Sequence, residues 1–214
     1  MSKVSPLVDG LINAFQCLPG VGPKSAQRMV LHLLERNKDA GLILAQLLEE
    51  ALESVDKCNS CRIFTESDSC QICSNEKRNK NQICVVESVS DVFAIEQSNQ
   101  FNGHYFVLHG YLSPIDDIGP EELALDVLFS RARQIETEEL ILATNSTLEG
   151  ETTSHFIYDN LKNETHLKIT KLARGVPLGG ELEYVDRGTI MHALSGRQRL
   201  KAVSYTHLTL PTRS

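Results

Sequence analysis

The chain has 214 residues, of which 41% are hydrophobic and 23% charged, a composition that is ordinary for a globular protein. This length predicts one or two domains with a real hydrophobic core. The longest apolar run is far short of a membrane span, so we expect no insertion into a membrane.

The net charge of −7 is distributed unevenly along the chain. Residues 1–38 hold five basic and two acidic side chains, whereas residues 81–160 hold two basic and fourteen acidic ones. An evenly acidic protein would repel nucleic acid, but a basic first region beside an acidic middle region indicates two different tasks on one chain.

Apolar side chains at helical spacing predict three helices in the first 56 residues. The first covers about residues 5–17, and the second begins at Pro23, a residue suited to the first position of a helix. The apolar face of the second helix holds Ala26, Met29, Val30, Leu33 and Leu34. The third covers about residues 39–56, and we expect its apolar side chains to face inward: Ile43, Leu44, Leu47, Leu48, Ala51 and Leu52.

A turn rich in glycine separates the first two helices, with the sequence Leu-Pro-Gly-Val-Gly-Pro-Lys over residues 18–24. Gly20 and Gly22 allow a tight turn with exposed amides, and those amides together with the helix dipole favour a phosphate. Lys24 and Arg28, one helical turn apart, extend that site along the polar face. The turn therefore predicts a phosphate-binding site, and an ordinary helical hairpin is the alternative.

Four cysteines follow with the spacing C-x2-C-x8-C-x2-C, namely Cys58, Cys61, Cys70 and Cys73. Two close pairs can each chelate one side of a tetrahedral ion, and four thiolates without histidine suit Zn²⁺. A complete set of four ligands leaves no position for a reacting water, so the predicted role is structural. Two disulfides are the alternative, which the lack of a signal peptide disfavours because cytosolic thiols stay reduced.

Strands and helices alternate after a polar linker at residues 75–82. The predicted strands cover residues 83–87, 105–108, 140–143 and 167–172. The predicted helices cover residues 90–97, 119–134 and 152–161, and Ser90 and Asp91 are suited to cap the first of them. This alternation predicts a parallel sheet with helices on both faces.

Three carboxylates lie where predicted strands end. Glu87 closes the first strand, and Glu149 and Glu151 follow the third. Ligands of parallel sheets bind beyond the carboxyl ends of the strands, and Mg²⁺ prefers oxygen ligands. A Mg²⁺ site is therefore one interpretation of these acids, and a set of solvated loop side chains is the other.

The last part of the chain contains a glycine-rich stretch, residues 174–183, that keeps apolar side chains, so we expect an ordered loop. Ile190, Met191 and Leu194 share one face of a short predicted helix, residues 186–194, that should dock against the sheet or a neighbouring subunit. Outside the four-cysteine group, Cys17 and Cys84 have apolar neighbours in sequence, and we expect both to be buried thiols.

Two further motifs are His-Gly-Tyr-Leu-Ser-Pro at residues 109–114 and Arg-Gly-Val-Pro-Leu-Gly-Gly-Glu-Leu-Glu at residues 174–183. Together with the glycine turn, the four cysteines, and Glu87 with Glu149-Gly150-Glu151, they resemble the RecR family of bacterial recombination mediators over residues 1 to about 200. The resemblance implies an α+β multidomain chain. Its parts are a helix-hairpin-helix DNA-binding region (1–56), a C4 zinc finger (57–76), an α/β Toprim domain with a parallel sheet (81–175) and a C-terminal helical assembly segment (176–200).

The same resemblance implies a role in recombinational repair of DNA damage. It implies a ring-shaped homotetramer, cytoplasmic and associated with the nucleoid, that binds DNA without reading its sequence through Gly20, Gly22, Lys24 and Arg28. Its implied partners are RecO and RecF, with which it loads recombinase onto gapped single strands.

Toprim relatives include nucleases, so a Mg²⁺-dependent nuclease is the alternative function. Those enzymes usually present a glutamate and an Asp-x-Asp pair, whereas this chain has Glu149 and Glu151. We therefore expect a non-enzymatic clamp without catalytic residues, in which Glu87, Glu149 and Glu151 serve partner docking, chiefly of RecO.

Two departures from the family pattern stand out. The family often reads Asp-Gly-Ile-Gly-Pro where this chain has Asp117 as the second residue, and a glycine lost there would change a turn that favours positive φ. Residues 201–214 look like nothing in the family, and we interpret them as a disordered, non-native tail that arose by read-through, from a cloning remnant or through a sequence-assembly error.

Overall fold

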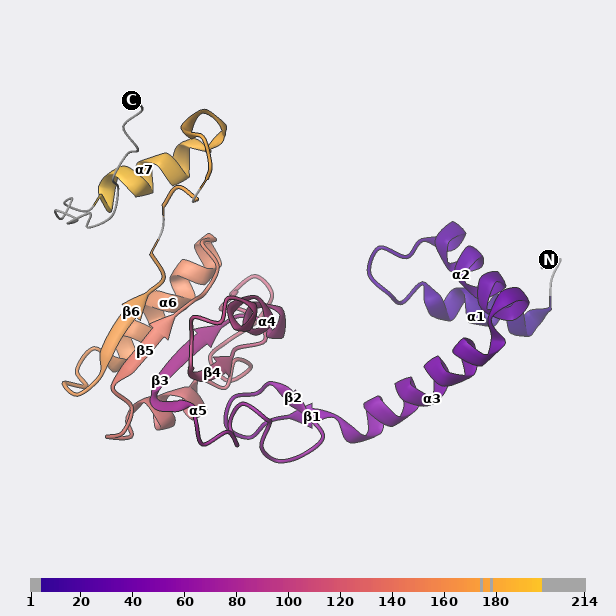
Figure 1. Ribbon diagram of the computed structural model, residues 1–214, viewed down its shortest axis with the longest axis horizontal. Helices are drawn as coiled ribbons and strands as arrows, with labels where there is room; N and C mark the ends of the chain where they lie inside the picture. The colour runs from indigo at the N-terminus through magenta and orange to yellow at the C-terminus, as the bar shows by residue number, and fades with distance from the viewer. Residues whose placement is uncertain (1–4, 174, 178, 198–214) are drawn as a thin grey trace, which may run out of the picture. The chain divides into compact units, whose positions relative to one another are not determined.

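The computed structural model describes residues 5–173, 175–177 and 179–197 (Figure 1). The chain divides into two compact units. The first unit comprises Met1–Asn79 with Ser88–Val107, and the second comprises Lys80–Glu87 with Leu108–Ser214. The predicted tail at residues 201–214 lies outside the described residues.

The first unit begins with three helices, as predicted: α1 (Pro6–Phe15), α2 (Pro23–Arg36) and α3 (Lys38–Ser54). Helix α2 packs against both α1 and α3, and its buried residues are Ala26 and Val30. The prediction that the apolar side chains of α3 face inward is wrong, because α3 has no buried residue and Leu52 is 77% exposed. The other two helices of this region have too little surface to cover the apolar side chains of α3.

The four-cysteine segment follows as a small antiparallel hairpin of β1 (Asp56–Lys57) and β2 (Phe64–Thr65). It is joined to β4 (Gly103–Val107) by a hydrogen bond in which the Val107 N–H donates to the Cys61 carbonyl. Helix α4 (Val89–Gln97) is joined to β4 and to the chain after the cysteines through Glu96, which accepts hydrogen bonds from the Tyr105 hydroxyl and from Arg78. A backbone hydrogen bond therefore ties the four-cysteine segment to β4.

The second unit is built on parallel strands, as the alternation predicted. Strand β3 (Asn79–Val86) pairs in parallel with β5 (Glu139–Leu142), which pairs in parallel with β6 (Lys168–Lys171). The whole sheet has the order β4-β3-β5-β6. Apolar residues of β3 and β5 are buried, and so is Cys84, which confirms the prediction of a buried thiol there. These strands therefore contribute to the core of the sheet.

Two helices of this unit begin elsewhere than predicted. Helix α6 (Leu148–Leu161) starts four residues earlier, because the Thr147 hydroxyl accepts a hydrogen bond from the Gly150 N–H and caps it. Helix α5 (Leu125–Ala132) starts later, because Ala124 adopts a left-handed conformation with φ 50° that ends the preceding turn. The N-cap of α4 is Ser88, not Ser90, and it forms a capping box with Asp91.

The chain continues with a short 3-10 helix (η1, Leu182–Tyr184) and helix α7 (Arg187–Ser195), which Asp186 caps. Helix α7 matches the predicted helix, but none of its residues is buried. None of the described helices combines the length and the apolar character of a membrane span. Cys17 is exposed after α1, so the prediction that it is buried is wrong: its apolar sequence neighbours belong to a turn and do not enclose it.

Candidate functional site

The glycine turn between α1 and α2 leads into a helix start that no side chain caps. Gly20 has φ 78°, a conformation that favours glycine, and Gly22 is the N-cap of α2. Gly22 has no side chain to cap the helix, and Pro23 at the first helical position has no N–H to satisfy. The next amides, those of Lys24 and Ser25, are left by helix geometry without an intrahelical partner and point their N–H groups out of the helix end.

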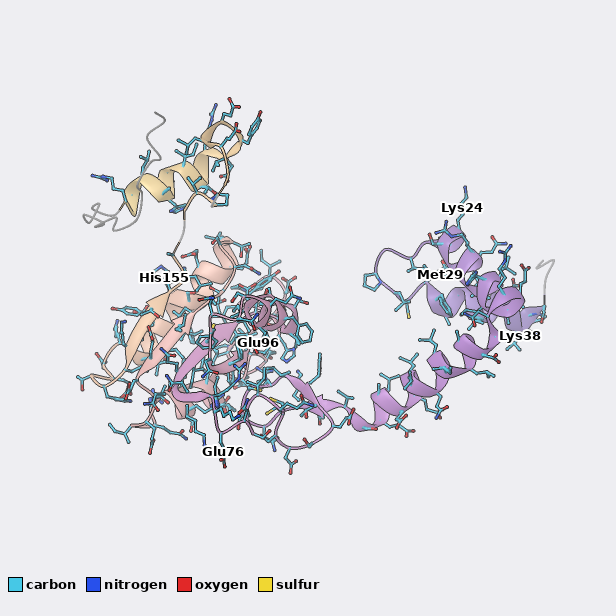
Figure 2. The ribbon with its side chains drawn as sticks, viewed as in Figure 1. Lys24, Met29, Lys38, Glu76, Glu96 and His155 are labelled. Carbon is cyan, nitrogen blue, oxygen red and sulfur yellow. The ribbon has the colours of Figure 1, made fainter. Side chains whose placement is uncertain are left out.

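Basic side chains continue this end of α2 along its exposed face. Lys24 and Arg28 are both exposed, and Lys24 projects outward from the start of the helix (Figure 2). They border a shallow hollow of about 460 Å³ whose other lining includes His32 and Arg36. The turn and this face together offer amides and cations to a phosphate.

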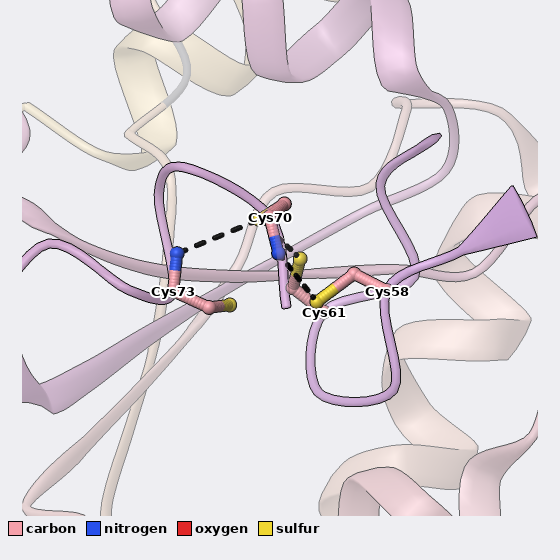
Figure 3. A group of neighbouring side chains, drawn as sticks. All are labelled: Cys58, Cys61, Cys70 and Cys73. Atoms are coloured by element: carbon pink, nitrogen blue, oxygen red, sulfur yellow. Dashed lines mark hydrogen bonds between the residues drawn. The ribbon is translucent and has the colours of Figure 1, made fainter. Parts of the chain in front are cut away.

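The four cysteines converge into one cluster although Cys58 and Cys73 are fifteen positions apart (Figure 3). Their sulfur atoms all lie within 4.8 Å of one another, and the Sγ atoms of Cys61 and Cys70 are 3.3 Å apart. A tetrahedral ion with Zn–S bonds of about 2.3 Å holds its sulfurs about 3.8 Å apart, so the cluster fits such an ion. All six cysteines are free thiols, which disfavours the two-disulfide alternative.

The surroundings of the cluster favour the thiolate form of Cys58. Burial acts to raise the pKa of the Cys58 thiol, but the backbone amides of Cys61, Cys70 and Ser60 outweigh it and lower that pKa to about 6. The pKa of Cys61 is raised, first by its hydrogen bond with the Cys73 side chain and then by burial. A bound cation would relieve this crowding of four sulfurs, because it favours the thiolate form of each.

Glu87 lies at the end of β3 and is only 6% exposed. Its carboxylate accepts hydrogen bonds from the backbone N–H of Asn145 at 2.8 Å and from the Asn145 side-chain amide at 2.5 Å. Gly150 lies against the same group, and a Cβ built there would lie 2.6 Å from Oε1 of Glu87. Glu87 therefore fixes the loop between β5 and α6, with its oxygens engaged by protein donors.

The other two predicted acids lie in the first turn of α6 and have different surroundings. Glu151 forms a two-oxygen ion pair with Lys171, at 2.6 and 2.7 Å, and burial lowers the pKa of Lys171. Glu149 is exposed, and its carboxylate makes no hydrogen bond or ion pair within the described residues. In that part of the chain the four cysteines are the only group of three or more potential ligands gathered within 4.8 Å.

Comparisons with known proteins agree with this arrangement of parts. Family models match residues 8–52 as the RecR helix-hairpin-helix, residues 81–173 as a Toprim domain and residues 175–198 as the RecR C-terminal region. The recombination protein RecR of Saccharophagus degradans is 54% identical over 196 residues, which is 92% of this chain and 99% of that protein. That of Coxiella burnetii is 51% identical over 194 residues, 90% of this chain and 96% of that protein.

The chain belongs to the RecR family. A role in recombination and repair follows from this membership, and the helix-hairpin-helix region is consistent with DNA binding. The α+β fold, with its Toprim domain and four-cysteine cluster, is confirmed.

Sequence reasoning missed two features of this RecR chain. Asn145 secures Glu87, and no spacing rule pointed to it, although an amide three residues after a buried strand was a usable signal. Thr153 accepts a hydrogen bond from the Leu112 N–H and donates to the Glu149 carbonyl. This hydroxyl joins the loop after β4 to the first turn of α6, where Glu149 lies.

Proposed function

We propose that this RecR chain is a non-enzymatic DNA clamp and scaffold, which acts with RecO and RecF to load recombinase onto gapped single-stranded DNA in the bacterial cytoplasm, at the nucleoid. The observation that carries the proposal is the uncapped start of α2 after Gly20, followed by the exposed Lys24 and Arg28. Such a site binds phosphates of any sequence, as a clamp that slides or is loaded at gaps requires.

The test is the DNA affinity of a Lys24→Glu/Arg28→Glu variant on single strands. Both side chains are exposed, so the variant should fold. It should lose most of its DNA affinity, and the slope of log Kobs against log salt concentration should become shallower by about 0.7 for each phosphate contact removed. Lys77→Glu/Lys80→Glu is the matched control, because it makes the same change in charge on exposed residues outside the turn. Equal affinity in the two folded variants would refute the assignment.

A structural Zn²⁺ at Cys58, Cys61, Cys70 and Cys73 belongs to the same proposal. When bound, the ion supplies folding free energy to a segment in which Ile63 is the one buried residue besides the cysteines among residues 57–76. Through the Cys61 carbonyl the segment also holds the edge strand β4. The support for zinc over other metals is the donor set, four thiolates with no histidine or carboxylate.

The absence of catalysis is supported by how the acids of the Toprim region are used. Glu87 is engaged by Asn145 and Glu151 by Lys171, so each has a role in holding the fold. Incubation of the protein with single-stranded and nicked DNA plus Mg²⁺ or Mn²⁺ should leave the DNA intact. Cleavage that Glu149→Gln abolishes would establish the nuclease instead.

We also propose that the chain closes into a ring-shaped homotetramer. An apolar hollow of about 470 Å³ lies on the first three helices, lined by Leu11, Leu34, Leu44 and Leu48 among others, and the leucines of α3 are at least half exposed. A second copy of the chain would cover this face. Light scattering coupled to size exclusion should give the mass of four chains.

The remaining role is partner docking at the exposed Glu149. RecO binds DNA and is expected to present a basic surface, which an unpaired carboxylate would attract. Glu149→Lys should weaken RecO binding and make it less sensitive to salt, whereas full affinity in this variant would count against the docking role. In this proposal Glu87 and Glu151 support Glu149 by holding the first turn of α6 in position.

A further inference from the structure

A hollow of about 440 Å³ lies where α5 and α6 pack together. It belongs entirely to the second unit, and neither the glycine turn nor the cysteines contribute to it. Its lining residues come from the turn before α5 and from the two helices: Pro120, Glu121, Leu125, Asp126, Phe129 and Phe156.

The lining has the chemistry of a site for a cationic side chain. Phe129 and Phe156 are partly exposed and offer aromatic rings, while Glu121 and Asp126 are exposed carboxylates. Neither carboxylate has a hydrogen bond or ion pair among the described residues. Arg133 lies over the Phe129 ring at 5.8 Å from its centroid, which shows that a guanidinium is compatible with this aromatic surface.

The charged residues that line the hollow, Glu121 and Asp126, have one sign. Residues 109–130 hold five aspartates and glutamates and no lysine or arginine. A hollow with aromatic walls and an acidic rim attracts a basic side chain, and arginine fits it better than lysine because its planar group also stacks on rings. An anionic or purely apolar occupant would leave these carboxylates unpaired and partly desolvated.

The hollow is in line with the proposed docking residue Glu149. Phe156 follows Glu149 by seven residues in α6, which is two helical turns, so the two lie on one face about 10 Å apart along the axis. A partner that reaches Glu149 can therefore place a second basic group in the hollow without bending around the helix.

We propose that the hollow between α5 and α6 receives an arginine side chain of the protein that docks at Glu149, so that the docking surface extends from the first turn of α6 to α5. This inference rests on the proposed function, in which that protein is RecO. The arginine would pair with Glu121 and Asp126 and stack on Phe156, and Glu149 would attract a neighbouring basic residue of the partner.

The experiment is calorimetric titration of RecO into the full RecR chain and its variants at two salt concentrations. Glu121→Lys should weaken binding about tenfold and flatten its salt dependence, since it replaces attraction by repulsion. Phe156→Leu keeps an apolar side chain but removes the ring, and should weaken binding about three- to fivefold. Glu136→Lys is the control, an exposed acid outside the hollow with the same change in charge, and should bind like wild type.

The outcomes separate the two proposals. If wild type binds RecO and Glu149→Lys weakens the complex, but Glu121→Lys and Phe156→Leu bind like Glu136→Lys, the hollow is not part of the interface and the proposed function stands. If folded wild type does not bind RecO, both the docking role and the hollow are overturned. Thermal unfolding of each variant, compared with wild type, establishes that a loss of binding is not a loss of fold.

Discussion

Gly150 packs tightly against the Asn145 carbonyl and the Glu87 carboxylate, and Gly150→Ala tests that packing directly. A Cβ at this position would lie 2.6 Å from Oε1 of Glu87 and closer still to the carbonyl oxygen of Asn145, whereas real Cβ atoms essentially never approach within 3.0 Å. The backbone carbonyl cannot rotate away as a flexible side chain would. The start of α6 must therefore move, and Asn145 must release at least one of its hydrogen bonds to Glu87.

The expected cost is the sum of three effects. Overpacking of a rigid site costs about 1–3 kcal/mol, and a weakened hydrogen bond to a buried carboxylate costs about 1–3 kcal/mol. Alanine in place of glycine in a helix returns about 1 kcal/mol. The free energy of unfolding should therefore fall by about 3 kcal/mol, a large share of the roughly 5–15 kcal/mol that holds a typical domain folded.

Urea denaturation followed by circular dichroism measures this loss. Gly10→Ala is the matched control, because Gly10 lies inside α1 with no atom within 4 Å of its would-be Cβ. That variant should be stabilised by up to about 1 kcal/mol. The reasoning fails if Gly150→Ala unfolds at the same urea concentration as wild type, or if the two alanine variants shift the midpoint in the same direction.

Two further predictions concern the metal and the loop after β4. Freshly purified protein should hold one Zn²⁺ per chain, and metal analysis that finds no zinc would contradict this. A chelator or Cys58→Ser should speed amide exchange in β4, because the Val107 N–H donates to the Cys61 carbonyl. Asp117 has φ 58°, so Asp117→Gly should keep or raise stability by up to about 1 kcal/mol, whereas Asp117→Val should lower it, as thermal unfolding would show.

The sequence predicted best what depends on periodic burial. The three N-terminal helices and the buried strands came from apolar spacing alone, and they lie within a few residues of their predicted bounds. The helix α3 was predicted correctly, but the prediction that its apolar face points inward was wrong. Apolar spacing reveals a stripe on a helix but does not say whether the same chain covers it.

Helix boundaries depended on single side chains that periodicity ignores. The hydroxyl of Thr147 starts α6 earlier than the apolar pattern does, and the left-handed Ala124 delays α5. Asp117 shows the opposite case, since the turn that favours positive φ was inferred from one expected glycine and the residue indeed has φ 58°. A local conformation is predictable when the residue type favours it. Alanine does not favour the left-handed conformation, so the sequence did not predict it at Ala124.

The three predicted acids illustrate why a site cannot be derived from residue types alone. Glu87, Glu149 and Glu151 are the same residue at comparable strand ends, yet an amide engages the first, a lysine neutralises the third and only the second keeps an unpaired carboxylate within the described residues. A Mg²⁺ site needs several such oxygens free and close together, while docking needs a single charge that is held still and left exposed. The hydrogen bonds from Asn145 and the ion pair with Lys171 hold the first turn of α6 in place, so they remove two ligands from a metal site and, by the same contacts, fix the position of Glu149.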